Sequence, residues 1–345
     1  MSTRPAITLQ VNLAPTDLPH AEHILPHQLR QWGPQVDEVV LVLDLHRSPG
    51  RYSEAWAERL PGMRRLLERH CREHPHARAV EVDYSPAMAA HLSRMFFGGR
   101  AIPAKDWNGA PFYAYLFGLY AAKHDYVFHL DSDMMFGGGS TTWAREAVEL
   151  LQERPDVLSC SPLPGPPTAD GELKSQVGIR EAHQSLAFRF PHLSTRLFFM
   201  DRSRFLTRVK ALPVVRPIRH RIWQAQVRGH PPYETLEGTF SRAMLDHGLS
   251  RVDFLGEHPG MWSVHPPYRS SLFYERLPAL IEQIESGAIP DGQRGHHDVN
   301  DSMVDWSSVR AIESSPRKRA MRCLAENLGK LYETVLERRP ARRGC

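Results

Sequence analysis

The chain has 345 residues, of which 41% are hydrophobic and 24% are charged, as in a soluble globular protein with a substantial core. Its net charge of +4 is compatible with phosphate-bearing ligands but too weak to indicate a nucleic-acid partner. No apolar run reaches the roughly 18 residues of a transmembrane helix, the first residues lack a secretory signal pattern, and the four scattered cysteines suit neither disulfides nor a metal site. We therefore expect a cytoplasmic protein, and leave peripheral contact with a membrane open.

Short β-type runs alternate with helical patterns in the N-terminal part of the chain. Strands are predicted at 6–11, 38–43, 79–82 and 126–130, and helices at 20–32, 53–73 and 113–123. The strands are nearly continuous in apolar residues, which is typical of a mainly parallel sheet with helices on both faces. The fold class predicted from this pattern is therefore α/β and Rossmann-like.

The middle of the chain continues the alternation less regularly. Further elements are predicted as a helix at 143–151, strands at 157–161 and 196–205, a helix at 239–246, a strand at 252–255 and a helix at 272–284. Thr141 or Thr142 is suited to cap the first of these helices. Prolines at positions 162, 164, 166 and 167 predict that the strand at 157–161 ends in a loop.

The C-terminal part predicts one more helix. Leu324, Leu328, Leu331 and Val335 are spaced by four, three and four residues, which places them on one helical face. Such a stripe is more often a core or homodimer contact than a membrane anchor. The basic end at 338–343 is expected to be a solvated tail.

Acidic residues follow several of the predicted strands. Asp44 and Asp83 each come after one strand, and Asp131 and Asp133 come after the strand at 126–130, just before three glycines. Ligands of open parallel sheets bind outside the carboxyl ends of the strands. Two carboxylates beside one small residue offer the oxygen ligands that Mg²⁺ or Mn²⁺ prefers, whereas an Asp-x-Asp pattern also occurs on solvated turns and as a helix cap.

The stretch YVFHLDSDMMF at 126–136 resembles the metal-binding Asp-x-Asp element of nucleotide-sugar glycosyltransferases with the GT-A fold, in particular the large inverting family 2-like group related to bacterial polysaccharide synthases. The order of elements agrees with that family over roughly residues 5–270. The resemblance implies a GT-A fold and a Mn²⁺ or Mg²⁺ cofactor, with Asp133 on the metal and Asp131 on the metal, its water or the ribose. Ser132 and Asp83 are expected beside the nucleotide sugar.

The same resemblance implies that Asp44 contacts the nucleotide base. The family usually has Asp-Asp-Gly-Ser at this point, whereas this chain has Asp44-Leu45-His46-Arg47, so a UDP-linked and a GDP-linked donor both stay open. In the region before the metal motif, the family holds the nucleotide sugar with basic or amide side chains. Arg100, Lys105 and Asn108 occupy this region, and Arg100 or Lys105 could pair with the diphosphate; ordinary surface residues are the alternative.

The resemblance also implies a general base at the start of a later helix. Glu237 matches this position and Glu234 is the reserve candidate, although a carboxylate at a helix N-terminus is also a common partner of the helix dipole. In many members a histidine completes the metal site, and His265 is preferred over His258. The segment 291–306, with His296, His297 and Asp298, is expected to be a mobile loop that could act as a lid.

These features predict a metal-dependent, inverting glycosyltransferase that moves a sugar from a nucleoside-diphosphate sugar to an acceptor. The domain is expected at 1–270, with a nucleotide-sugar half to about 140 and an acceptor half from about 141, followed by a helical extension at 271–345. The segments 162–167 and 216–233, with Trp223 and Tyr233, are expected to shape the acceptor pocket. One alternative is a sugar-nucleotide nucleotidyltransferase, although residues 12–17 lack its glycine-rich basic loop. The other is a catalytically silent GT-A-like binding module.

Overall fold

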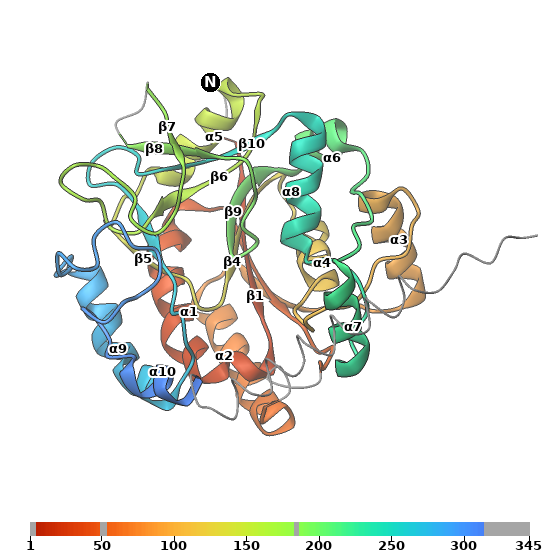
Figure 1. Cartoon of the computed structure of the whole chain (residues 1–345), viewed down its shortest axis with the longest axis horizontal. Coiled ribbons are helices and arrows are strands. Elements are labelled where there is room, and N and C mark those ends of the chain that lie inside the picture. Colours follow the sequence, from red (N-terminus) through yellow and green to blue (C-terminus); the bar gives the residue numbers. More distant parts are fainter. Residues whose placement is uncertain (1–4, 49–53, 183–185, 314–345) are drawn as a thin grey trace, which may run out of the picture.

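The computed structural model describes residues 5–48, 54–182 and 186–313, which form one sheet of 11 strands with helices on both faces (Figure 1). The strands are β1 (Ile7–Leu13), β2 (Glu38–Leu43), β3 (Ala77–Glu81), β4 (Tyr126–Asp131), β5 (Met135–Gly137), β6 (Val157–Pro164), β7 (Ile179–Arg180), β8 (Ala187–Phe190), β9 (Leu197–Asp201), β10 (Ser250–Phe254) and β11 (Trp262–Val264).

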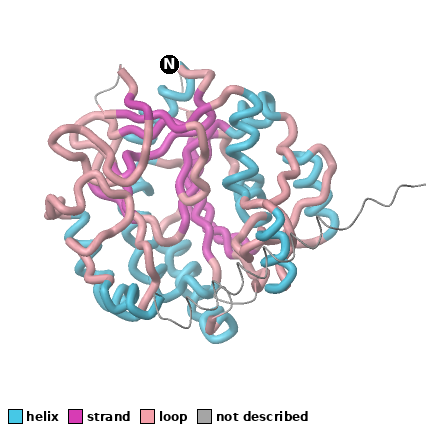
Figure 2. Tube along the Cα trace, viewed as in Figure 1, coloured by secondary structure: helices cyan, strands magenta, loops and turns pink. Residues whose placement is uncertain are grey.

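The strand order is β3-β2-β1-β4-β9-β6-β10-β8-β7, with β11 beside β6 and β5 beside β11. Strands β5, β8 and β9 run against the others, so the sheet is mixed but mainly parallel in direction. This confirms the predicted α/β class with a Rossmann-like sheet. Figure 2 shows the strands crossing the middle of the molecule with helices on either side.

Ten α-helices and two 3₁₀ turns, at Pro15–Asp17 and Gly33–Gln35, are present in the described residues. The helices are α1 (Leu18–Trp32), α2 (Trp56–Glu73), α3 (Pro86–Phe97), α4 (Tyr113–Ala121), α5 (Trp143–Glu153), α6 (Arg202–Val209), α7 (Arg219–Arg228), α8 (Leu236–His247), α9 (Ser271–Glu285) and α10 (Ser307–Glu313).

Two apolar cores cover the two faces of the sheet. In β2, Val39 and Leu41 belong to the core under α1, α2 and α5, whereas Val40 and Val42 belong to the core under α3, α4, α6 and α8. This alternation follows from the two-residue period of a strand. Because both faces are buried, β2 has no polar position between Glu38 and Asp44, which is why it could be predicted with its observed bounds.

Two predicted elements differ from the structure in the middle of the chain. Strand β6 continues to Pro164 instead of ending in a loop before Pro162. The prolines are tolerated because the residues that follow them supply the backbone hydrogen bonds to the next segment. The amides of Leu163 and Gly165 donate to the carbonyls of Met261 and Ser263. The predicted strand at 196–205 ends at Asp201, whose side chain accepts from the Arg204 amide and caps α6.

Helix α3 was not predicted, although its boundaries carry recognisable signals. Ser85 accepts a hydrogen bond from the Met88 amide, Pro86 occupies the first turn, and Gly98 ends the helix with φ of 60°. These are the usual features of a helix start and stop. Its apolar residues Leu92, Phe96 and Phe97 are buried in the second core.

A third apolar core joins β5, β8 and β11 to α9 and α10. Helix α9 packs against α1 and β5, so residues beyond 270 lie directly on the sheet domain; the division at 270 stays a prediction. The predicted helix with Leu324, Leu328, Leu331 and Val335, and the basic tail, lie outside the described residues. In the described part of the chain, no helix has the length and apolar content needed to cross a membrane.

Candidate functional site

The ends of β1, β2 and β4 bring the predicted acidic residues to one edge of the sheet. In the parallel ladder, Asn12 pairs with Asp131, and Leu13 pairs with Leu43, the residue before Asp44. The Asp131 amide donates to the carbonyl of Arg196, which ties the start of β9 to the same edge at 2.8 Å. This edge is therefore the candidate site, as the strand-end rule predicts.

The carboxylate of Asp131 is held by neighbours on one face of the sheet. Its Oδ1 accepts from the Tyr115 hydroxyl at 2.8 Å and lies 3.4 Å from His129 Nε2. His129 stands two residues before Asp131 on the same strand, so both side chains point to the same face. Asp131 is thus oriented by α4 and β4 rather than free in solvent.

Asp133 is the most buried carboxylate of the edge. Its Oδ2 accepts from the Arg269 guanidinium at 2.6 and 3.1 Å and lies 3.4 Å from His265 Nε2. Although burial raises the pKa of Asp133, Arg269 and His265 together hold it well below its usual range. Its Oδ1 is buried and has no hydrogen-bond donor in the described residues, so one ionised oxygen is left unsatisfied.

Arg269 and the turn after β1 complete the surroundings of Asp133. Arg269 Nη1 donates to Asp17 Oδ1 at 3.1 Å, so one guanidinium bridges Asp133 and Asp17. Ser132 Oγ lies 3.0 Å from His20 Nε2, and burial lowers the pKa of His20 to about 4, which keeps this imidazole neutral at pH 7. Ser132 is therefore fixed by α1 and lies next to both acidic residues.

His265 is anchored by the segment that was expected to be a lid. The His265 amide donates to the His297 carbonyl, and the Val299 amide donates to the His265 carbonyl, both at 2.9 Å. On the side chain, His265 Nδ1 lies 3.3 Å from Asp298 Oδ1. Instead of a loose loop, the structure holds the segment 297–299 beside His265 as a short strand-like pairing. Asp298 thereby orients the imidazole toward Asp133.

Asp44 forms a second, closed cluster at the end of β2. Its Oδ2 accepts from Lys105 Nζ at 2.6 Å, and its Oδ1 accepts from the Tyr84 hydroxyl at 2.9 Å and from the His46 amide at 2.8 Å. Both side chains of this pair are less than one tenth exposed. The sequence placed Asp44 and Lys105 at the site separately, and the structure joins them as a buried ion pair.

The other residues that were predicted to bind the nucleotide sugar form hydrogen bonds within the protein. Arg100 donates to the carbonyls of Phe97 and Leu212, which directs its guanidinium into the end of α3. Asn108 accepts from Arg228 at 3.1 Å. Asp83 is exposed and accepts from the Ser85 amide at 2.7 Å. Arg100 is therefore not directed toward the carboxylates.

The two candidate bases occupy different positions. Glu237 lies in the first turn of α8, and its Oε2 accepts from the Thr195 amide at 3.3 Å. Thr195 precedes Arg196, whose carbonyl holds Asp131, so Glu237 faces the same edge. Glu234 instead accepts from the Thr235 amide and lies 3.5 Å from Arg221.

The surroundings of Asp133 suit a divalent cation in part. The unsatisfied Asp133 Oδ1 and His265 Nε2 are an oxygen and a nitrogen of the types that Mn²⁺ accepts. The carboxylate of Asp131, however, is directed toward Tyr115, and the three predicted ligands do not form one compact group within the described ranges. In this arrangement Arg269 supplies the positive charge.

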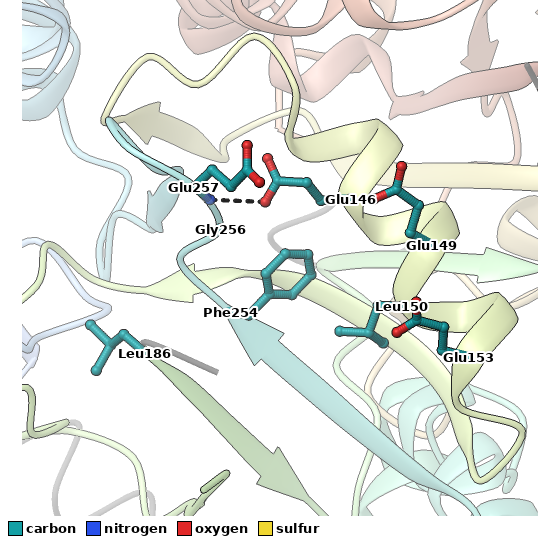
Figure 3. Close-up of a pocket in the computed structure, with 8 residues that line it drawn as sticks. All are labelled: Glu146, Glu149, Leu150, Glu153, Leu186, Phe254, Gly256 and Glu257. Carbon is teal, nitrogen blue, oxygen red and sulfur yellow. Dashed lines mark hydrogen bonds between the residues drawn. The ribbon is translucent and has the colours of Figure 1, made fainter. Parts of the chain in front are cut away.

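The structure also contains a cavity of about 250 Å³ between α5 and the end of β10 (Figure 3). It is lined by Glu146, Glu149, Leu150, Glu153, Leu186, Phe254, Gly256 and Glu257. Four carboxylates and no basic side chain repel an anionic nucleotide. The cavity therefore does not replace the edge with Asp133 as the candidate site.

Several site residues were missed from the sequence. Arg269, Asp17 and Asp298 come from elements far from β4 along the chain, and no spacing rule connects them to Asp133, whereas Tyr115 lies in α4, the helix just before β4. His129 did carry a signal, because a histidine inside an otherwise apolar buried strand needs a polar neighbour.

No protein-family model and no curated protein matches the chain significantly. Among solved structures, it is similar to residues 1–349 of TarS from S. aureus, with 11% identity, a TM-score of 0.36, and coverage of 83% of this chain and 67% of that one. It is also similar to the mannosyltransferase PcManGT from Pyrobaculum calidifontis, in complex with GDP-Man and Mn²⁺, with 15% identity, a TM-score of 0.35, and coverage of 96% and 83%. A UTP-bound UGPase from Acinetobacter baumannii has 10% identity and a TM-score of 0.39, with coverage of 79% and 92%. Likenesses at these TM-scores do not assign a function to the chain.

Proposed function

We propose that the chain is a GT-A glycosyltransferase that moves a sugar from a nucleoside-diphosphate sugar to a hydroxyl or similar nucleophile of an acceptor. The observation that carries this proposal is the carboxylate of Asp133, which is buried at the strand-end edge and has one oxygen without a donor in the described structure. Leaving an ionised buried oxygen unsatisfied is costly, so such an atom points to a ligand.

The donor would lie along the edge from Asp44 to Asp133. Asp44 would contact the base, held in place by Lys105, while Asp131 and Ser132 would contact the ribose and diphosphate side. Arg196 is a better candidate partner of the diphosphate than Arg100, because its side chain is exposed and its carbonyl holds the Asp131 amide at this edge.

Asp133 and His265 would hold the cation, with Asp131 contacting it directly or through water. A bound Mn²⁺ or Mg²⁺ would neutralise charge on the departing diphosphate. Arg269 would then keep its contact with Asp17, which lies 3.1 Å from its guanidinium and is independent of Asp133. Asp298 would keep the His265 ring oriented.

Glu237 would act as the general base. It would take the proton from the acceptor hydroxyl as the oxygen forms a bond to the anomeric carbon, and the bond from that carbon to the diphosphate oxygen would break on the opposite side. The products would be the glycosylated acceptor, with inverted configuration, and a nucleoside diphosphate.

The acceptor would enter beside α7. The guanidinium of Arg221 lies 4.9 Å from the centre of the Trp107 ring, and the Trp107 amide donates to the Tyr233 carbonyl at 2.9 Å. These contacts place α7 and the segment around Tyr233 against the loop that carries Lys105. Aromatic and basic side chains of this kind suit a sugar or an aromatic acceptor.

A nucleotidyltransferase that makes the sugar nucleotide is less well supported. The turn after β1 ends in Asp17, whose carboxylate is directed to Arg269, and its side chain also accepts from the Ala14 amide. Nucleotidyl transfer needs a phosphate-binding loop for the triphosphate at this position, whereas this loop presents a carboxylate.

Calorimetric titration with UDP and GDP, with and without Mn²⁺, tests the proposal. We expect one nucleotide to bind in a Mn²⁺-dependent manner, and Asp133→Ala to weaken this binding by about 10–100-fold. Asp125→Ala, which removes an exposed carboxylate just before β4, is the matched control and should bind like the parent. The absence of metal-dependent nucleotide binding in the parent would overturn the proposal. Binding without hydrolysis of any sugar in a nucleotide-sugar panel would favour the silent module.

A further inference from the structure

A second group of metal-ligating side chains lies at the C-terminal end of α2, away from the candidate site. Helix α2 runs back across the sheet from the side of Asp44 and ends just before β3 begins, so this end faces the opposite edge. His70, Glu73 and His74 occupy the last turn and the C-cap. Spacings of three and four residues place their side chains on one helical face.

The ligand atoms of this group already converge. One atom from each of His70, Glu73 and His74 lies within 4.8 Å of the other two, and no other group of three or more histidines, cysteines or carboxylates in the described chain meets this condition. The His70 and His74 rings are stacked with centroids 6.1 Å apart. A small shift of side chains on one turn of a rigid helix would therefore bring three ligands onto one ion.

His70 is buried and lacks hydrogen-bond partners. Its side chain is only 4% exposed, and neither ring nitrogen makes a hydrogen bond within the described structure, although Nδ1 lies 3.2 Å from Glu73 Oε2. The buried Nε2 of this imidazole, which has no partner in the described structure, is unusual unless a ligand satisfies it.

His76 extends the group beyond the helix. Its ring lies 6.2 Å from that of His74, in an edge arrangement, and its Nε2 is also buried without a hydrogen-bond partner among the described residues. The His76 carbonyl accepts from the Val39 amide at 3.0 Å, so this residue already belongs to the start of the sheet. It is the natural source of a fourth ligand.

We propose that His70, Glu73 and His74 bind Zn²⁺ or a similar borderline divalent cation, with His76 or water in the fourth position. Two imidazoles and one carboxylate are typical Zn²⁺ ligands, whereas Mg²⁺ prefers oxygen ligands alone. The ion would join the end of α2 to the start of β3, so its role would be structural. The proposal is independent of the function proposed for the strand-end edge.

The test is calorimetric titration of the metal-free full chain with Zn²⁺ at pH 7.5. We expect a tight site in the parent that Glu73→Gln and His74→Gln each weaken by about 10–100-fold. These variants change an exposed and a half-buried side chain, so they should stay folded, unlike a change at His70. Glu68→Gln, an exposed position on the same helix, is the matched control and should bind Zn²⁺ like the parent.

The Asp133→Ala variant separates this site from the strand-end edge. We expect it to retain the tight Zn²⁺ site, and we expect Zn²⁺ to raise the Tm of the parent and of Asp133→Ala but not of His74→Gln. If His74→Gln and Glu73→Gln bind Zn²⁺ as tightly as the parent, or if the tight site disappears with Asp133, the proposal is wrong and the group is only a histidine–glutamate ion pair.

Discussion

Two ion pairs, each with a buried carboxylate, lie at the same edge of the sheet and differ in how fully that carboxylate is enclosed. Lys105 and Asp44 are 2.6 Å apart, both are almost fully buried, and both oxygens of Asp44 have hydrogen-bond donors. Arg269 and Asp133 are also 2.6 Å apart, but the Arg269 side chain is 40% exposed and one oxygen of Asp133 has no donor in the described structure. We call the first pair closed, because every oxygen of its carboxylate has a donor, and the second pair open, because one oxygen has none.

We expect this difference to separate a carboxylate that is fixed in place from one that can exchange its cation. A closed buried pair is hard to replace, because removing one partner leaves an uncompensated charge in the protein interior. In an open pair, the arginine can turn toward solvent while another cation takes its place on the carboxylate. Neighbouring strand ends can therefore carry the same residue types, with one carboxylate held rigidly by its partners and the other open to a new cation.

The largest expected effect tests whether the open pair belongs to a catalytic site. Glu237→Gln should lower turnover by about 10²–10⁴-fold, because it removes the proposed base but keeps the size of the side chain. Glu234→Gln should change turnover less than about threefold, a loss of under 1 kcal/mol. Transfer of radiolabelled sugar from the donor found in the nucleotide panel measures both variants. If Glu234→Gln abolishes turnover and Glu237→Gln does not, the base is misassigned by three residues.

The next prediction tests the difference between the two ion pairs through their contributions to stability. Lys105→Met should lower the free energy of unfolding by about 3–5 kcal/mol, because Asp44 is left buried without its cation. Arg269→Met should cost less, about 1–3 kcal/mol, because the buried Asp133 loses a donor but keeps His265 3.4 Å from its carboxylate. Urea denaturation followed by circular dichroism measures both, with the exposed Lys123→Met as control. Equal losses for Lys105→Met and Arg269→Met would show that the two pairs do not differ.

The smallest effect concerns a third buried contact, between α1 and α9. The Phe136 amide donates to His27 Nε2 at 2.9 Å, so His27 is neutral and its Nδ1–H donates to Glu285 at 2.6 Å. Burial lowers the pKa of His27, so just below about pH 6.5 the unfolded chain takes up a proton that the folded chain does not. Stability should therefore fall as the pH is lowered through this window.

The titration of Glu285 occurs at a lower pH and does not overlap with that of His27. The hydrogen bond from His27 lowers the pKa of Glu285 to about 2, so its stabilising effect is lost only as the pH falls below about 4.5, the ordinary pKa of a glutamate. We expect His27→Gln to reduce the fall in Tm between pH 6.5 and 5 by about 2–4 °C, with the exposed His23→Gln as control. An unchanged pH slope in His27→Gln would contradict a neutral, buried His27.

The sequence predicts the first half of the fold well for a physical reason. Strands β2 and β4 are nearly continuous apolar runs followed by Asp44 and ending at Asp131, so both their buried nature and their ends are visible locally. It also predicts that Asp131 and Asp133 reach one edge. The roles assigned to them, and to His265 and Glu237, stay predictions.

The parts that could not be predicted depend on contacts between distant segments. The guanidinium of Arg269 reaches Asp133 across 136 positions of the chain, and no local pattern encodes that pairing. Arg100 and Lys105 have similar surroundings in the sequence, yet one is directed to backbone carbonyls and the other to Asp44. Only tertiary packing decides between such equivalent basic residues.

The two prolines in β6 have a consequence for the shape of the sheet edge. Because the amides of Leu163 and Gly165 point toward β11, positions 162 and 164 point toward β9, and proline offers no donor there. Strand β9 accordingly pairs with β6 only at Ser159 and Cys160, and its start at Leu197 stays with β4. The prolines thus end the hydrogen-bonded pairing between β6 and β9. As a result, the start of β9 beside Asp131 does not join β6 in a continuous sheet.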